Sequence, residues 1–101
     1  MAEPEDDEPV VLPIEDWIDL HTFAPRDVPS VVESYLEAAR EAGLREVRIV
    51  HGRGKGVQKE RVRQVLGRSP LVVAFEEATP ERGGHGATVV RLRPRGEDQS
   101  G

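Results

Sequence analysis

Residues 47–56 read Val47-Arg48-Ile49-Val50-His51-Gly52-Arg53-Gly54-Lys55-Gly56, and this stretch decides the fold. Val47, Ile49 and Val50 are typical of a strand, which ends at His51 where three glycines at alternate positions interrupt the pattern. Helical spacing follows at once, and Gly67 is expected to end the helix. Its apolar stripe is Val57, the stem of Arg61, Val62, Val65 and Leu66. A strand, a glycine loop and a helix in this order predict an α/β fold.

The upstream segments supply a second strand and a second helix. Trp17 to Leu20, preceded by Ile14, reads as a short strand. A helix is predicted over Val28–Ala42 because apolar residues recur there at helical spacing. Its signals are Asp27 as the cap, Pro29 in the first turn and Gly43 at the end.

The downstream segments read as two further strands. Leu71 to Phe75 is a continuous apolar run between Pro70 and Glu76, which favours a strand buried on both faces. A glycine-rich loop follows, and residues 88–93 alternate as a last strand.

The order of these elements is βαβαββ, which predicts an α/β sandwich of two or three layers with a mixed, mostly parallel four-stranded sheet. Strands joined through helices should be parallel, with right-handed crossovers. The short connection after Phe75 predicts that the last strand is antiparallel to the third.

Length and composition exclude several protein classes. The chain has 101 residues and no cysteine, which fits one small domain without disulfides or thiolate chemistry. Residues 1–9 and 94–101 have little apolar content and are expected to be disordered tails around a domain at 10–93. No apolar run approaches the ~20 residues that a membrane helix needs. The expected location is therefore the cytoplasm, with no membrane partner and a monomer as the default.

The net charge of −5 hides a strong asymmetry along the chain. Residues 1–39 carry a net −10, whereas residues 40–68 carry nine bases and three acids, a net +6. Such a cluster is either a solvated helix surface or the footprint of a polyanion. The acidic tail could cover the basic loop, although a role in solubility is the simpler interpretation.

Three polar motifs fall at the carboxyl ends of the predicted strands, the edge where open α/β sheets bind ligands. They are Asp19-Leu20-His21, the loop His51 to Gly56, and Gly83-Gly84-His85-Gly86. All three histidines of the chain therefore belong to this edge.

The loop from His51 to Gly56 is the most informative of the three motifs. Its glycines permit close approach of another chain, and its amides, with the start of the following helix, form an anion site. Arg53 and Lys55 add positive charge. The spacing differs from that of a phosphate-binding P-loop, and Val57 stands where the magnesium-binding hydroxyl would be. A flexible turn with incidental bases is the alternative.

Asp19 and His21 are candidates for a general base or a pair that positions water. Alternatively they tie the strand end to its neighbours, or they form a metal site with His51 and His85, although no short metal-ligand spacing is present. Lys59 and Arg63 stand four residues apart on one helix face and could follow a phosphate backbone.

These motifs resemble those of the Smr domain, a family named for its relation to the C-terminal part of certain MutS proteins. The resemblance spans about Ile14 to Leu92 and rests on three segments in order. They read Ile18-Asp19-Leu20-His21-Thr22, His51-Gly52-Arg53-Gly54-Lys55-Gly56 and Gly83-Gly84-His85-Gly86-Ala87-Thr88. Thr22 departs from the family, whose first motif has glycine at this place.

The resemblance implies a fold similar to the C-terminal domain of bacterial translation initiation factor three, and nicking of DNA or structured RNA. Asp19, His21 and His51 are the expected catalytic residues. The expected nucleic-acid contacts are Gly52, Arg53, Gly54, Lys55, Gly56, Lys59, Arg63, Gly84 and His85. Mg²⁺ or Mn²⁺ is left open as a cofactor, and no organic cofactor is expected. The alternatives are a binding module without catalysis and a protein interaction adaptor.

Overall fold

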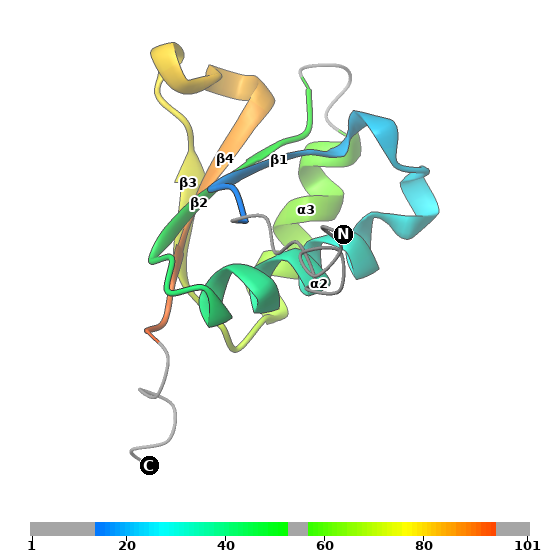
Figure 1. Ribbon diagram of the computed structural model, residues 1–101. Helices are drawn as coiled ribbons and strands as arrows, with labels where there is room; N and C mark the ends of the chain where they lie inside the picture. The colour runs from blue at the N-terminus through cyan, green and yellow to red at the C-terminus, as the bar shows by residue number, and fades with distance from the viewer. Residues whose placement is uncertain (1–13, 53–56, 95–101) are drawn as a thin grey trace, which may run out of the picture.

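The computed structural model describes residues 14–52 and 57–94. Its strands and helices follow the predicted βαβαββ order (Figure 1): β1 (Trp17–Asp19), α2 (Val28–Glu41), β2 (Glu46–Val50), α3 (Val57–Arg68), β3 (Val72–Glu77) and β4 (Ala87–Leu92). Four short 3₁₀ turns connect them: η1 (Leu20–Thr22), η2 (Pro25–Asp27), η3 (Pro80–Arg82) and η4 (Gly84–Gly86). The tails predicted at 1–9 and 94–101 lie outside the described residues, apart from Pro94.

The four strands form one mixed sheet in the order β1-β2-β4-β3. β1 is parallel to β2, whereas β4 is antiparallel to both of its neighbours. Three strands therefore run in one direction, as predicted, and the last strand is antiparallel to the third. Among the described strands, β1 with β2 is the one parallel pair, because β4 lies between β2 and β3.

Both helices cover the same face of the sheet, so the domain has two layers (Figure 1). The chain moves across the sheet in the same direction at each crossover, and crossovers of one hand then place both helices on one side. α2 and α3 also pack against each other. In the described part of the chain, no α-helix lies on the other face.

The core lies between the helices and the sheet and consists of aliphatic side chains. Its fully buried members include Leu20, Val28, Val32, Leu36, Ile49, Val62, Leu66, Val90 and Leu92. The stripe predicted for α2 is confirmed in this core. In the segments that the structure describes, no helix has both the length and the apolar character required to span a bilayer.

Several predictions at the ends of elements were wrong. Asp27 makes no side-chain bond to the start of α2, because it is the last residue of η2 and its backbone is already in the helical region. Val57 is 57% exposed and does not belong to the core stripe. Gly67 lies inside α3, which continues to Arg68.

The prediction that residues 71–75 form a strand buried on both faces was also wrong. β3 is an edge strand, because β4 occupies the position beside β2. Its residues are intermediate or exposed, and Val73 is 51% exposed at an irregularity in the pairing with β4.

Candidate nucleic-acid interface

Asp19, His51, Gly52 and the turn that contains His85 lie at the edge of the sheet where β1 and β2 end and β4 begins. Asp19 closes β1, His51 follows β2, and η4 immediately precedes β4. The backbone N–H groups of His51 and Gly52 both donate to the carbonyl of Gly86, at 2.9 and 3.0 Å. These bonds join the start of the glycine loop to the turn that contains His85.

Asp19 and His21 form a hydrogen-bonded pair at the end of β1. Oδ1 of Asp19 accepts from the backbone N–H of His21 at 3.0 Å and lies 2.7 Å from the Nδ1 atom of its ring. These hydrogen bonds, the backbone one first, lower the pKa of Asp19 below its usual value. Because an ionised carboxylate only accepts, the hydrogen of the ring lies on Nδ1. The Nε2 atom of His21 is then left with a lone pair, on a side chain that is 73% exposed.

The turn that brings Asp19 and His21 together forms without glycine. Thr22 stands in η1 and has an ordinary negative φ, since no described residue other than glycine has a positive φ. Asp19 also caps this turn through its side chain. The threonine at this position is therefore compatible with the local geometry.

His51 is buried, only 6% exposed, and both of its ring nitrogens have partners. Nδ1 lies 3.1 Å from the carbonyl of Gly52, which can only accept, so Nδ1 carries the hydrogen. Nε2 then accepts a hydrogen bond from the Thr88 hydroxyl at 2.9 Å. Burial lowers the pKa of His51 below its usual value, and the charges of Lys59 and Arg63 act in the same direction against the effect of the Gly52 carbonyl.

The glycine loop begins at Gly52 with a φ of +85°, a value that favours glycine. Arg53, Gly54, Lys55 and Gly56 lie outside the described residues. The predicted anion site therefore stays a prediction, framed by Gly52 on one side and by the start of α3 on the other.

Glu77 at the end of β3 connects two of the predicted contact residues. Its two carboxylate oxygens lie 2.8 Å from Nζ of Lys59 and 2.9 Å from Nδ1 of His85. The hydrogen bond from Lys59, followed by that from His85, lowers the pKa of Glu77. A phosphate that contacts Lys59 would therefore also lie close to the negative charge of the Glu77 carboxylate.

Arg63 also turns toward β3. Its guanidinium carbon lies 5.8 Å from the centre of the Phe75 ring, within the range of a cation–π contact. Lys59 and Arg63 thus share one face of α3, as predicted, and this face packs against β3.

The second glycine turn is tightly packed. A Cβ atom on Gly83 would lie 2.8 Å from the Cβ of Ala87, and the φ of Gly83 is +120°. Gly84 is buried, whereas His85 is 76% exposed. The turn consequently holds the His85 side chain at the surface.

Comparison with known proteins identifies the family. Residues 18–93 match the model of the Smr domain. The chain belongs to the Smr domain family. It is 40% identical over 77 residues to Endonuclease MutS2 of Thermus thermophilus and 41% identical over 76 residues to that of Caldicellulosiruptor saccharolyticus. These matches cover 76% and 75% of the chain but only 10% of each relative, so the chain spans about a tenth of the length of the curated relatives.

Two crystal structures have the same fold. The Smr domain of Thermus thermophilus MutS2 superimposes with a TM-score of 0.75 at 39% identity, covering 79% of this chain and all of that one. YdaL, a stand-alone small MutS-related protein from Escherichia coli, gives 0.67 at 31% identity and covers 77% and 64%.

Of the four residues considered as metal ligands, Asp19 and His21 pair with each other in this Smr domain, whereas His51 and His85 have other partners. Asp19 pairs with His21, His51 with Thr88 and His85 with Glu77. In the described segments, no three His, Asp or Glu side chains form a group that could hold a metal ion. A metal at this edge would therefore need ligands from the nucleic acid, from water or from residues beyond these segments.

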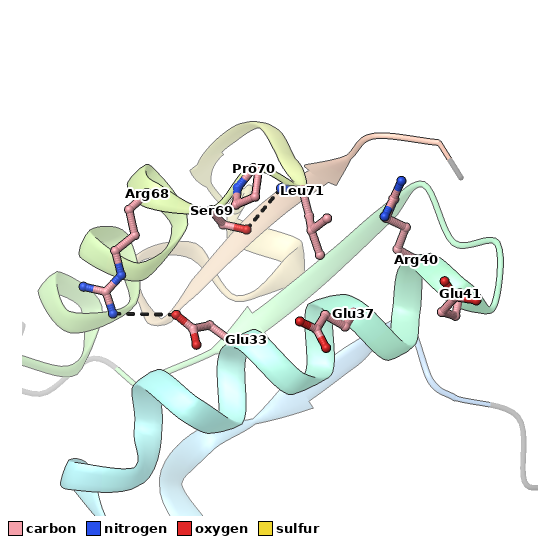
Figure 2. A pocket seen from close by; sticks show the side chains of 8 residues that line it. All are labelled: Glu33, Glu37, Arg40, Glu41, Arg68, Ser69, Pro70 and Leu71. Atoms are coloured by element: carbon pink, nitrogen blue, oxygen red, sulfur yellow. Dashed lines mark hydrogen bonds and ion pairs between the residues drawn. The ribbon is translucent and has the colours of Figure 1, made fainter. Parts of the chain in front are cut away.

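A groove of about 400 Å³ lies between α2 and the end of α3, away from the glycine loop. Figure 2 shows Glu33 of α2 directed toward Arg68 of α3, with the nearest oxygen and nitrogen 3.7 Å apart. The groove contains no predicted site residue of the Smr domain.

Sequence reasoning missed the contributions of Glu77, Thr88 and Phe75. Thr88 was part of the third motif, but its partner His51 follows a different strand, β2. Glu77 follows an apolar run that was interpreted as a strand buried on both faces. Its position beside α3 follows from the alternation of side chains between the two faces of an edge strand.

Proposed function

We propose that this Smr domain binds nucleic acid at the carboxyl edge of its sheet and nicks a phosphodiester bond there. Family membership supports the proposal, as does the name of the relatives, Endonuclease MutS2. Because the chain covers only a tenth of those relatives, their activity comes to this chain as part of the proposal.

The observation that carries the proposal is the orientation of His21 by Asp19. The carboxylate fixes the hydrogen on Nδ1 and leaves the exposed Nε2 as a proton acceptor, the arrangement of a general base. In the proposed reaction, Nε2 takes a proton from water as the water oxygen attacks phosphorus. The P–O bond to one sugar breaks, the leaving oxygen takes a proton from solvent, and His21 returns its proton to solvent.

Binding would rest on the glycine loop and the turns around it. Backbone amides of Gly52 to Gly56 and the start of α3 favour an anion, and Arg53 and Lys55 add charge. Lys59, Arg63, Gly84 and His85 would border this site.

The burial of His51 favours a positioning role over direct proton transfer. Its ring supports the Gly52 carbonyl on one side and Thr88 on the other. In the proposed function, His51 holds the glycine loop against β4 while the loop binds phosphate.

A binding module without catalysis is the second candidate. Both ring nitrogens of His51 are already hydrogen-bonded, so only Asp19 and His21 of the expected catalytic residues are available for catalysis, which supports this candidate. Mg²⁺ or Mn²⁺ remains a proposed cofactor, and no step above depends on it.

One experiment tests the proposal. The purified chain is incubated with supercoiled plasmid, branched DNA and structured RNA, each with Mg²⁺, with Mn²⁺ and with EDTA. Nicking of any substrate supports the enzyme, and the EDTA arm reports the metal requirement. Binding without cleavage on every substrate favours the binding module, and no binding at low salt contradicts both.

A further inference from the structure

The face of the sheet opposite the helices carries its own set of side chains. Val47 and Ile49 of β2 point into the core, so Glu46, Arg48 and Val50 point to the opposite face. The pairing register adds their neighbours to this face, which we call the open face. Its further members are Trp17, Asp19, Ala74, Glu76, Val89 and Arg91.

Two arginines lie beside the carboxylate of Glu46 on the open face, and a third, Arg48, contacts the backbone of one of them. Oε2 of Glu46 lies 3.2 Å from a guanidinium nitrogen of Arg82, and Oε1 lies 4.0 Å from one of Arg91. Arg48 donates to the backbone carbonyl of Arg82 at 3.1 Å. Glu46 offsets one of the three positive charges, and Asp19 and Glu76 add two further acids to the same face, so positive charge is concentrated only in the cluster around Glu46.

The only tryptophan of the chain lies beside this cluster. Trp17 pairs with Arg48 in the register of β1 and β2, and its side chain is 41% exposed. Asp19 follows two residues later on the same face, about 6.5–7 Å further along the strand. The indole thus lies between the arginine cluster and the Asp19–His21 pair.

We propose that the open face binds single-stranded nucleic acid, with a base stacked on Trp17 and phosphates at Arg48, Arg82 and Arg91. This inference rests on the proposed function in one respect: the bound nucleic-acid strand is taken to continue from the open face to the proposed catalytic residue His21. The guanidinium groups of Arg48, Arg82 and Arg91 favour phosphates, and the exposed indole favours a polyanion that carries bases.

The shape of the face favours a single strand over a duplex. Ala74 and Val89 contribute to a shallow hollow of about 80 Å³, which Phe75, Glu76 and Arg91 also line. Bases reach such a surface only when they are unpaired and free to turn toward it.

The single tryptophan provides the direct test. Intrinsic fluorescence is followed while the chain is titrated at low salt with oligo-dT, oligo-rU, a duplex of equal length, and heparin as a polyanion without bases. We expect quenching by dT or rU, less by the duplex and none by heparin. The two single strands distinguish DNA from RNA. Equal quenching by heparin, or none by either oligonucleotide, would overturn the proposal.

Variants separate stacking from charge, with a labelled oligonucleotide as the probe. Trp17→Ala should weaken single-strand binding roughly 5- to 150-fold, the effect of losing one stacked base, whereas Trp17→Phe should retain most of the affinity. Phe23→Ala is the control, because Phe23 is similarly exposed, at 38%, but follows η1 rather than lying on the open face. Equal losses in Trp17→Ala and Phe23→Ala would contradict the assignment.

The arginines are tested by salt dependence. Arg48→Gln with Arg91→Gln should reduce the log–log salt slope by up to about 1.4, at roughly 0.7 per phosphate contact on a single strand. Arg68→Gln, at the far end of α3, should leave the slope unchanged. If binding responds to Arg53→Ala and Lys55→Ala but not to the open-face variants, the proposed function stands and this inference fails.

Discussion

The Nε2 atom of His51 lies 2.9 Å from the hydroxyl of Thr88, and this contact joins the end of β2 to the second residue of β4. Thr88 is fully buried and His51 nearly so. Since Nδ1 donates to the Gly52 carbonyl, the Thr88 hydroxyl must donate to Nε2. Two motifs that are 37 residues apart in the sequence are thus one hydrogen-bonded unit at the base of the glycine loop.

Replacing Thr88 tests this unit. Thr88→Val keeps the shape of the side chain but leaves Nε2 of His51 buried without a partner, which costs about 1–3 kcal/mol. We expect the free energy of unfolding in urea to fall by this amount. Thr79→Val, at an exposed threonine without a side-chain capping bond, should change it by less than about 0.5 kcal/mol. Equal stabilities of the two variants would contradict the role of the contact.

The lowered pKa of His51 predicts a loss of stability in mild acid. Below the usual histidine pKa of 6.5, His51 is protonated in the unfolded chain but stays neutral in the folded chain, where burial lowers its pKa. The free energy of unfolding should therefore be fully present above pH 6.5 and fall as the pH decreases toward the folded pKa. Asp19 and Glu77 act in the same direction, but only as the pH falls below about 3.8 and 4.5.

Urea denaturation at pH 7.5, 6.5 and 5.5 measures this dependence. His51→Asn retains a donor toward the Gly52 carbonyl but has no titratable group, so its stability should vary less over this range. An unmutated chain with constant stability between pH 7.5 and 5.5 would contradict the prediction.

The periodicity of the sequence was sufficient to predict the elements and their order, but not the neighbours of each strand. The apolar run at residues 71–75 was interpreted as a central strand. Periodicity shows which faces of a strand are apolar, but not whether the strand lies at the centre or the edge of the sheet. Insertion of β4 beside β2 depends on which pairing buries more surface, which no local pattern records. Asp27 also shows that local patterns are insufficient. Its backbone conformation is that of η2, and the preference of aspartate for capping positions does not reveal this turn.

The candidate site was predictable as an edge but not as a set of contacts. Topology alone places the three histidines at the carboxyl ends of strands. The differences between them arise from partners on other elements: Thr88 for His51, Glu77 for His85, and a local turn for His21. Composition gives no information about these pairings.

The glycine loop is tested by removing its charges. Arg53→Ala with Lys55→Ala should weaken binding to duplex DNA and reduce the log–log salt slope by up to about 1.8, at roughly 0.9 per phosphate contact. Arg61→Ala with Arg68→Ala removes the same charge from the middle and end of α3 and should have a smaller effect on the slope. Unchanged affinity and slope in the loop variant would favour the interaction adaptor.

Glu77 should limit the affinity for nucleic acid. Glu77→Gln removes the carboxylate beside Lys59 and His85, so the charge of Lys59 becomes available to a phosphate. We expect tighter duplex binding and a steeper salt dependence. Glu33→Gln is the matched control, because it releases Arg68 at the other end of α3 with the same change in net charge. Tightening by Glu33→Gln alone would argue that net charge at that end, and not the carboxyl edge, governs binding.

The Asp19–His21 pair separates catalysis from binding. If Asp19 orients His21 as a general base, then Asp19→Asn and His21→Ala should lower single-turnover nicking by about 10²–10⁴-fold while equilibrium binding changes little. His85→Ala should cost less, because His85 is paired with Glu77 in a separate turn. Thermal unfolding of each variant excludes loss of the fold as the cause. Unchanged nicking in both variants would leave Asp19 and His21 as a cap on η1 and remove the catalytic assignment.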